Sequence, residues 1–329
     1  MAVKLTISVE SFDLIKPFTI SRGTRTEAIV VTVKLSDGQI TGWGECTPYP
    51  RYGESVSSVI QQIEDKRELL KNGLSRDTLS EIMKPGAARN ALDNALWDFE
   101  AKRLDVPAFK LAGLTEQKPV TTAYTISLDD VEEMARIAAQ EAHRPVLKVK
   151  FGSPEGDLER IKAVRQAAPD ATLIADANEG WEGDSLQELL NACADYNYAL
   201  VEQPVPAAQD DILRTISRPP LMICADESVH DRNSLDRLVG LYDAVNIKLD
   251  KTGGLTEALR LMAAARQRDF TIMVGSMLCT SLGIAPATIL AQEASFIDLD
   301  SPLLIKEDRP VPLKIENAVV PPPPHELWG

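Results

Sequence analysis

Charged residues recur at regular intervals through the second half of the chain. Lys150, Asp176, Glu202, Asp226 and Lys248 each close a short apolar run, at intervals of 26, 26, 24 and 22 residues. Each interval accommodates one strand followed by one helix, and a random scatter of charges would not keep phase with such a repeat. The spacing therefore predicts charged side chains at the carboxyl ends of successive parallel strands, which is the active-site face of a barrel.

Three of these residues are acids that the repeat brings together. Asp176, Glu202 and Asp226 follow three adjacent expected strands, so their carboxylates can converge. Converging carboxylates repel one another and do not all stay ionised without a cation. Oxygen ligands suit a hard ion, with Mg²⁺ as the default. The alternative, acids that cap the following helices, explains each residue singly but not three in phase.

Two lysines share one face of the second expected strand. Lys148 and Lys150 are two residues apart, so both side chains point the same way. Adjacent ammonium groups near a cation lower a lysine pKa from about 10.4 toward neutrality, as a general base requires. Lys150 lies nearer the barrel mouth and is the candidate base, with Lys148 tuning it. A pair of solvent-facing lysines is the alternative.

A third lysine closes the sixth expected strand, which lies across a barrel from the second. Lys150 and Lys248 would then approach a bound carbon atom from opposite faces, one removing a proton and the other returning it. That arrangement inverts a stereocentre next to a carboxylate, and a divalent ion would stabilise the enolate formed. Lys251 lies past the strand end and is interpreted as a loop charge.

Eight apolar runs alternate with amphipathic segments such as Asp157–Ala168 and Leu255–Arg268. Nearly every connection has the length of a helix, which favours an α/β fold of the barrel type over an open sheet. The eight expected strands are Thr122–Ile126, Val146–Phe151, Thr172–Asp176, Ala199–Gln203, Leu221–Asp226, Ala244–Lys248, Thr271–Gly275 and Ser295–Asp300.

The remaining chain predicts a second, smaller unit. Strand-like runs at Lys4–Val9 and Ala28–Leu35, a turn at Asp37-Gly38 before Gln39–Trp43, and a helical pattern over 86–102 indicate an α+β domain. We expect a capping domain at 1–118, the barrel with the catalytic site at 119–305, and a segment at 306–329 packing back toward the cap. Pro321–Pro324 is expected to lie extended on the surface.

Composition excludes several classes of function. The formal net charge of −14 disfavours nucleic acid and anionic membranes as partners. The sequence has no 18-residue apolar run that could span a membrane. Its amino terminus alternates between apolar and polar residues like a strand and lacks the continuous apolar stretch of a signal peptide. The four cysteines form no C-x-x-C pair and have no matching histidine cluster, so we expect a reduced, cytoplasmic protein.

The motifs K-V-K, D-A-N-E-G-W, V-E-Q-P, A-D-E-S and N-I-K-L-D-K-T-G-G resemble those of the enolase superfamily, in its muconate-lactonising subgroup. The resemblance implies a modified TIM barrel, (β/α)7β, with an amino-terminal α+β capping domain. It also implies that Asp176, Glu202 and Asp226 bind Mg²⁺ and that Lys150 and Lys248 form the acid/base pair.

Further stretches resemble one branch of that subgroup. Asp298-Leu299-Asp300 resembles the D-x-D motif of dipeptide epimerases, which would hold a substrate ammonium group. F-T-I-S-R-G-T-R resembles the L-Ala-D/L-Glu epimerases of Gram-negative bacteria. There Arg25, or less well Arg22, would meet the glutamyl side-chain carboxylate. With M-L-C-T-S, the resemblance extends to Thr125 and Met277 as further substrate contacts.

The resemblance thus implies an isomerase that interconverts L-Ala-D-Glu and L-Ala-L-Glu by two-base 1,1-proton transfer, in the recycling of cell-wall (murein) peptides. Alternatives are a dipeptide epimerase of other specificity, an N-acylamino acid racemase, an o-succinylbenzoate synthase, or a barrel that binds a metal or peptide without turnover. The expected partner is a small dipeptide, and the sequence leaves open a homo-oligomer.

Overall fold

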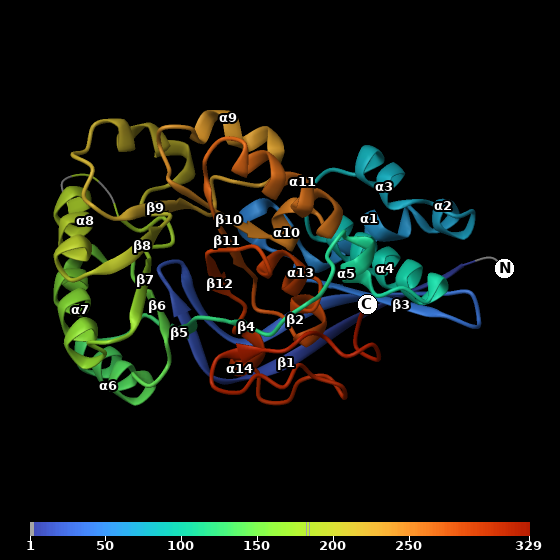
Figure 1. Cartoon of the computed structure of the whole chain (residues 1–329), viewed down its shortest axis with the longest axis horizontal. Coiled ribbons are helices and arrows are strands. Elements are labelled where there is room, and N and C mark those ends of the chain that lie inside the picture. The colour runs from blue at the N-terminus through green and yellow to red at the C-terminus, as the bar shows by residue number, and fades with distance from the viewer. Residues whose placement is uncertain (1–2, 182, 184) are drawn as a thin grey trace.

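Eight parallel strands form the main sheet of the computed structural model, which describes residues 3–181, 183 and 185–329. The first two residues of the expected capping domain therefore lie outside the described residues. Each strand pairs with its sequence neighbour, as the repeat predicted (Figure 1). The strands are β5 (Tyr124–Ile126), β6 (Val146–Lys150), β7 (Thr172–Asp176), β8 (Tyr198–Glu202), β9 (Met222–Ala225), β10 (Ala244–Lys248), β11 (Thr271–Gly275) and β12 (Phe296–Asp298).

The two edge strands of this sheet curl toward each other. The backbone N–H of Ala123 donates to Ile297 O at 2.8 Å, and the N–H of Leu299 donates to Thr122 Oγ1 at 2.8 Å. These bonds join the segment before β5 to β12, so the sheet closes into a near-barrel. Strands four apart in the order, such as β6 and β10, consequently face each other across its axis. The expected barrel is confirmed.

Helices cover the outside of the sheet unevenly. In Figure 1, α6, α7 and α8 line its outer flank, whereas the connections after β8 and β9 hold only 3-10 turns and one short helix. Helix-length connections were expected nearly throughout. Prolines bracket the connection after β8, and its helical turns are interrupted at Gln209 (φ −117°, ψ 15°), so they do not continue as an α-helix. The helical elements of the barrel are α6 (Val131–Glu141), α7 (Pro154–Ala167), α8 (Ser185–Asp195), η2 (Ala207–Arg214), η3 (Arg232–Ser234), α9 (Leu235–Leu238), α10 (Leu249–Thr252), α11 (Leu255–Arg266), α12 (Ser281–Ile284), α13 (Ala287–Ala291) and α14 (Ser301–Leu304).

An antiparallel sheet and a group of helices make up the amino-terminal unit. Its strands are longer than the sequence suggested, because the β1–β2 hairpin continues past its apolar core and ends in a turn at Ser21–Arg22 beside the barrel. The elements are β1 (Lys4–Ile20), β2 (Gly23–Ser36), β3 (Thr41–Cys46), η1 (Pro50–Tyr52), α1 (Val56–Glu64), α2 (Arg67–Lys71), α3 (Arg76–Ile82), α4 (Ala87–Leu104) and α5 (Ala108–Leu111).

Helix α4 packs closely on β3. A Cβ placed on Gly42 or Gly44 would overlap backbone atoms of α4, so only glycine lets the two elements approach this far. The helix presents the face predicted from its periodicity, and these side chains are buried in the core of the unit: Ala88, Ala91, Leu92, Ala95 and Phe99.

The carboxyl-terminal tail packs onto the rest of the molecule. Strand β13 (Val319–Val320) pairs with β4 (Val120–Thr121), and the four prolines that follow are half-buried. Trp328 is buried, and its indole N–H donates to Asn94 O at 3.0 Å. The tail thus packs back onto the amino-terminal unit, where Trp328 buries a large apolar surface beside α4.

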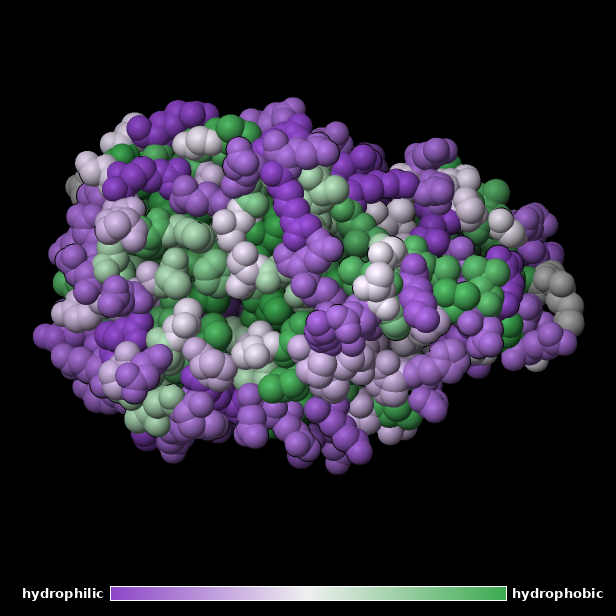
Figure 2. Space-filling view, in the orientation of Figure 1, coloured by the Kyte–Doolittle hydropathy of each residue, from purple (hydrophilic) through white to green (hydrophobic). Residues whose placement is uncertain are grey.

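Figure 2 shows one face of the molecule, with hydrophilic residues around its rim and hydrophobic residues gathered toward the middle. In the part of the chain that the structure describes, no helix is both long enough and apolar enough to span a membrane.

A buried carboxylate joins the amino-terminal unit to the barrel. Asp250, in α10, accepts hydrogen bonds from the backbone N–H of Thr47 and from Asn90 Nδ2, both at 2.9 Å. Burial raises the pKa of Asp250 from its ordinary value of 3.8 to about 7, although both hydrogen bonds oppose the shift. The folded protein therefore holds a proton here that the unfolded chain releases near pH 4.

This proton predicts how stability depends on pH. Because the folded-state pKa is the higher one, the contribution of Asp250 to the free energy of unfolding falls as pH rises from about 4 to about 7. An Asp250→Asn variant cannot ionise, so its stability relative to the parent should rise between pH 5 and pH 8, on the order of a few kcal/mol. Urea unfolding of both proteins across that range measures the difference.

The control is Asp211→Asn, whose side chain is 88% exposed and should give no such pH trend. A stability difference between Asp250→Asn and the parent that stays constant from pH 5 to pH 8 would contradict the assignment.

Candidate active site

The barrel strands place the predicted charged residues side by side. Lys150 pairs in register with Asp176, and Asp176 pairs with Glu202, so three adjacent strands end on charged side chains at one level. Asp226 follows the last residue of β9, and Lys248 ends β10. All five side chains are buried. The structure therefore gathers at one end of the barrel the residues that the spacing brought into phase.

Lys148 lies at the centre of this group. Its Nζ is 2.6 Å from Glu202 Oε2, 2.7 Å from Asp298 Oδ2 and 3.1 Å from Asp176 Oδ2. Lys150 lies nearer the mouth, as expected, with its Nζ 2.6 Å from Asp176 Oδ2. Lys148 thus links β6 to carboxylates on β7, β8 and β12.

Two further lysines converge on Asp226 from the other side. Lys248 Nζ is 2.6 Å from Asp226 Oδ2 and 3.9 Å from Glu202 Oε1. Lys251 is only 1% exposed and ion-pairs with Asp226 Oδ1. Its interpretation as a loop charge was wrong, because the short helix α10 turns Lys251 back under the end of the barrel.

These contacts determine the direction of several pKa shifts. Burial alone would lower the pKa of Lys148, but Asp176, Asp298 and Glu202 together raise it well above its usual value. Burial would also lower the pKa of Lys248, but Asp226 and Glu202, with Glu227, together raise it. The residue predicted to act as the general base is Lys150, and that role stays a prediction.

The pKa values of two neighbouring carboxylates, Asp176 and Glu202, shift in opposite directions. Burial would raise the pKa of Asp176, but Lys148 and Lys150 hold it below its usual value. Burial and the neighbouring Asp176 instead raise the pKa of Glu202 to about 7, with Lys148 opposing the shift. Closely spaced acids whose pKa values are shifted in opposite directions are typical of functional sites.

A cavity of about 530 Å³ opens above these charges, between the barrel and the amino-terminal unit. Three buried oxygens on its lining residues have no hydrogen-bond partner within the described residues: Asn178 Oδ1, Glu227 Oε2 and Asp298 Oδ1. Asp176 and Glu202 lie outside the lining. The sequence-predicted residues that line it are Arg22, Arg25, Thr125, Lys148, Lys150, Asp226, Lys248, Met277, Asp298 and Asp300.

The donor set suits a hard cation. Asp176, Glu202 and Asp226 supply carboxylate oxygens from adjacent strand ends, which are the ligands that Mg²⁺ favours. Among residues 3–181, 183 and 185–329, however, no three His, Cys, Asp or Glu side chains are arranged to hold a metal, and lysine ammonium groups lie between these carboxylates. The ligand assignment stays a prediction that the chemistry of the donors supports.

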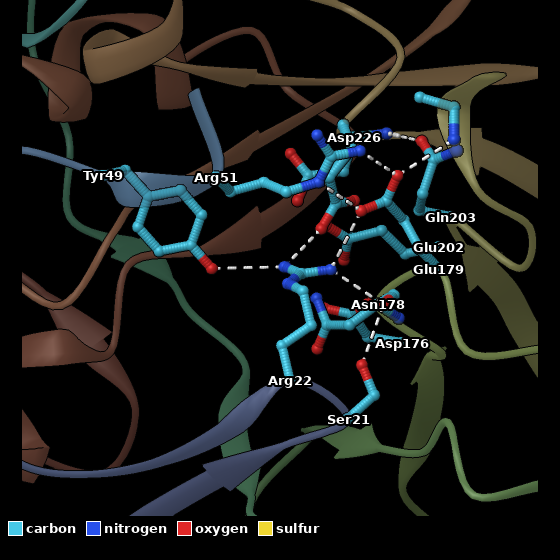
Figure 3. Close-up of polar contacts among 12 residues, drawn as sticks. Ser21, Arg22, Tyr49, Arg51, Asp176, Asn178, Glu179, Glu202, Gln203 and Asp226 are labelled. Atoms are coloured by element: carbon cyan, nitrogen blue, oxygen red, sulfur yellow. Dashed lines mark hydrogen bonds and ion pairs between the residues drawn. The ribbon is translucent and has the colours of Figure 1, made fainter. Parts of the chain in front are cut away.

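Loops of the amino-terminal unit contact the barrel beside the cavity (Figure 3). Arg22 donates to Asn178 O at 2.8 Å and to Glu227 Oε1 at 2.6 Å. Arg51, in η1, forms a two-pronged ion pair with Glu179 at 2.7 and 2.8 Å. Glu179 and Glu227 were not predicted as contact residues, although they stand inside the motifs D-A-N-E-G-W and A-D-E-S.

Arg25 differs from Arg22 in its surroundings. Its guanidinium lies over the Tyr49 ring, 5.1 Å from the centroid. Within the described part of the chain it has no hydrogen bond or ion pair, whereas two carboxylates already neutralise Arg22. Of the two candidates, Arg25 is the cation that remains available to a ligand in the cavity.

The acidic pair at the end of β12, Asp298 and Asp300, lines the opposite side of the barrel mouth from β8. Asp300 Oδ2 accepts the backbone N–H of Thr125 at 2.6 Å, and burial with the nearby Asp298 raises the pKa of Asp300 to about 7. Asp298 contacts Lys148 through one oxygen and leaves the other unpartnered. The pair can accept a hydrogen-bond donor or a cation from the cavity.

Comparison with known proteins agrees with this architecture. Residues 2–113 match the amino-terminal domain of mandelate racemase and muconate lactonizing enzyme, and residues 129–325 match the enolase carboxyl-terminal domain-like family. The chain is 48% identical to the L-Ala-D/L-Glu epimerase of Escherichia coli, covering 91% of this chain and 93% of that protein. It is 39% identical to the N-acetyl-D-glutamate racemase of a Pseudoalteromonas species, covering 91% and 95%.

Two solved structures extend the comparison. An enolase family member from Agrobacterium tumefaciens with homology to dipeptide epimerases, with bound sodium and L-Ala-L-Glu, has a TM-score of 0.97 and 51% identity. The match covers 99% of this chain and all of that one. The Enterococcus faecalis dipeptide epimerase, complexed with Mg and L-Leu-L-Tyr, has a TM-score of 0.90 and 28% identity, covering 98% and 97%. The chain therefore belongs to the enolase superfamily, in the family of mandelate racemase and muconate lactonizing enzyme.

Proposed function

We propose that this protein is an epimerase that interconverts L-Ala-D-Glu and L-Ala-L-Glu. The observation that carries the proposal is the placement of Lys150 and Lys248. They end β6 and β10, which face each other across the barrel, and both line the same cavity. A carbon atom bound between them would present one face to each lysine, as proton removal and return on opposite faces requires.

The lysines move the proton between two defined atoms. A neutral Nζ takes the α-proton of the glutamyl residue, and the electron pair left on carbon passes into the adjacent carboxylate as an enolate. The ammonium Nζ on the other side then gives its proton to the same carbon, so the configuration inverts and the two lysines exchange protonation states. Lys148, held by three carboxylates, acts on the charge around Lys150.

We further propose that Asp176, Glu202 and Asp226 bind Mg²⁺. Support comes from the buried oxygen donors on three adjacent strands and from the Mg complex of the Enterococcus faecalis enzyme. When bound, the cation would stabilise the negative charge that develops on the substrate carboxylate.

Recognition of the two substrate ends follows from charge. We assign the substrate ammonium group to Asp298 and Asp300, with Thr125 holding Asp300 in place. The side-chain carboxylate of the glutamyl residue is assigned to Arg25, whose planar guanidinium gives a two-pronged partner. Met277 supplies apolar lining beside the acidic pair. The Agrobacterium tumefaciens structure, which contains L-Ala-L-Glu, supports this choice of dipeptide.

The relationship to a known L-Ala-D/L-Glu epimerase also supports a place in the recycling of cell-wall peptides, which contain this dipeptide.

A second candidate is racemisation of N-acetylated glutamate, which the Pseudoalteromonas relative favours. Such a substrate keeps both carboxylates but has no ammonium group. The buried acidic pair distinguishes the two candidates, because two carboxylates beside a neutral acetyl group would cost desolvation without a compensating ion pair.

The two-base arrangement predicts that replacing either lysine stops epimerisation, while each variant keeps proton exchange with a different diastereomer. Lys150→Ala and Lys248→Ala should each lower epimerisation at least a hundredfold, because each removes one proton-transfer group. In deuterium oxide, each variant should still exchange the glutamyl α-proton of one diastereomer, and the two variants should differ in which one. Proton NMR of the separate diastereomers measures both effects.

Lys162→Ala, at an exposed position of α7, is the matched control and should behave as the parent. Both lysine variants exchanging the same diastereomer would rule out opposite-face proton transfer.

The assignment of the substrate ammonium group to the acidic pair predicts that a variant of the pair loses activity only toward substrates that carry such a group. Asp300→Asn preserves shape but lowers the negative charge, so kcat/KM for L-Ala-L-Glu should fall at least tenfold. The same variant should leave activity toward N-acetyl-L-glutamate unchanged or improved. Initial rates with both substrates test this, and a parent enzyme that prefers N-acetyl-L-glutamate would support the second candidate instead.

A further inference from the structure

Asp226 lacks the backbone support that its two companions have. Asp176 and Glu202 lie within the ladder that joins β6, β7 and β8. The pairing of β9 ends earlier, at Cys224 opposite Glu202 and at Ala225 opposite Val245. Asp226 therefore stands one residue beyond its strand, where sheet hydrogen bonds no longer fix its position.

Gln203 replaces part of the missing ladder. Its side-chain Oε1 accepts the backbone N–H of Asp226 at 2.9 Å and that of Ser228 at 3.1 Å. Its Nε2 donates to Val205 O and to Tyr242 Oη, both at 2.9 Å. Because Gln203 directly follows Glu202 and is fully buried, it ties the segment that carries Asp226 to the end of β8.

Lys251 supplies the remaining contacts. Its Nζ donates to Asp226 O at 2.6 Å and to Asn246 O at 3.0 Å, and it ion-pairs with Asp226 Oδ1. One ammonium group thus contacts the backbone carbonyl and one carboxylate oxygen of the same residue. The other carboxylate oxygen of Asp226, Oδ2, contacts Lys248, and Asp226 is among the residues that line the cavity.

We propose that Lys251 and Gln203 are positioning residues that hold Asp226 with a single carboxylate oxygen, Oδ2, directed at the cation. This inference rests on the proposed function, because it assumes that Asp226 is a cation ligand. A buried ammonium group close to a divalent cation repels it. A lysine at this position is therefore unfavourable for cation binding unless the orientation it imposes on Asp226 outweighs the repulsion.

The two possible roles of Lys251 therefore predict opposite changes in Mg²⁺ affinity when this lysine is replaced. If Lys251 contributed only its charge, replacing it with a neutral side chain of similar length would strengthen Mg²⁺ binding. If Lys251 orients Asp226, the same replacement frees the carboxylate and weakens binding, by the ten- to hundredfold typical of residues that support metal ligands.

The experiment is isothermal titration calorimetry of Mg²⁺ into the parent protein and into Lys251→Met, without substrate. The proposal predicts a Kd about ten- to hundredfold higher for Lys251→Met. An unchanged or lower Kd would overturn it. A parent protein that binds no Mg²⁺ would overturn the metal part of the proposed function as well, so the two failures are distinguishable.

Gln203→Met tests the same claim independently and decides it if Lys251→Met does not fold. It removes the acceptor for the Asp226 N–H and should also raise the Mg²⁺ Kd at least tenfold. Tyr242→Phe is its matched control, because it removes a contact of Gln203 Nε2 but leaves the bond to Asp226. Its thermal unfolding midpoint should fall while its Mg²⁺ Kd stays within about twofold of the parent. Equal weakening of Mg²⁺ binding in Gln203→Met and Tyr242→Phe would overturn the positioning role.

Discussion

Buried charge at one end of the barrel is the constraint on which the rest of the structure depends. Lys148, Lys150, Lys248 and Lys251 are almost fully buried there, and each lies within ion-pair distance of Asp176 or Asp226. A buried charge is tolerated only beside an opposite one, and removing one partner leaves the other at a cost of several kcal/mol. The strands must therefore keep the register that interleaves lysines with carboxylates. The same interleaving provides two lysines on opposite sides of one cavity, which is the arrangement that epimerisation needs.

The amino-terminal unit completes this site from a distance in the sequence. The tip of the β1–β2 hairpin and the η1 segment reach Asn178, Glu179 and Glu227 at the barrel mouth through Arg22 and Arg51. These contacts hold in place the wall that carries Arg25, the cation left available for a substrate carboxylate. Selectivity and chemistry are thus divided between two parts of the chain. In the proposed function, the barrel supplies proton transfer, and the hairpin supplies recognition of the glutamyl side chain.

The sequence could predict the barrel because its strand–helix repeat is local and periodic, and charged residues at strand ends interrupt otherwise apolar runs. For that reason the sequence alone could identify five of the site residues: Lys150, Asp176, Glu202, Asp226 and Lys248. Other features depend on partners far along the chain. The raised pKa of Lys148 depends partly on Asp298, which is 150 residues away. Lys251 is directed inward by one short helix, and Trp328 is buried beside α4, and no periodic pattern around either residue predicts its burial. Glu179 and Glu227 belong to recognisable motifs, but the sequence could not predict which arginines pair with them, because those contacts form only in the folded protein.

The central claim is that the α-proton of the glutamyl residue, and no other, is removed and returned on opposite faces. Proton NMR of the parent protein with Mg²⁺ and L-Ala-L-Glu in deuterium oxide tests it most directly. We expect loss of the glutamyl α-proton signal and appearance of the L-Ala-D-Glu diastereomer, with the alanyl α-proton signal intact. Absence of exchange at the glutamyl α-carbon, or exchange at the alanyl one, would contradict it.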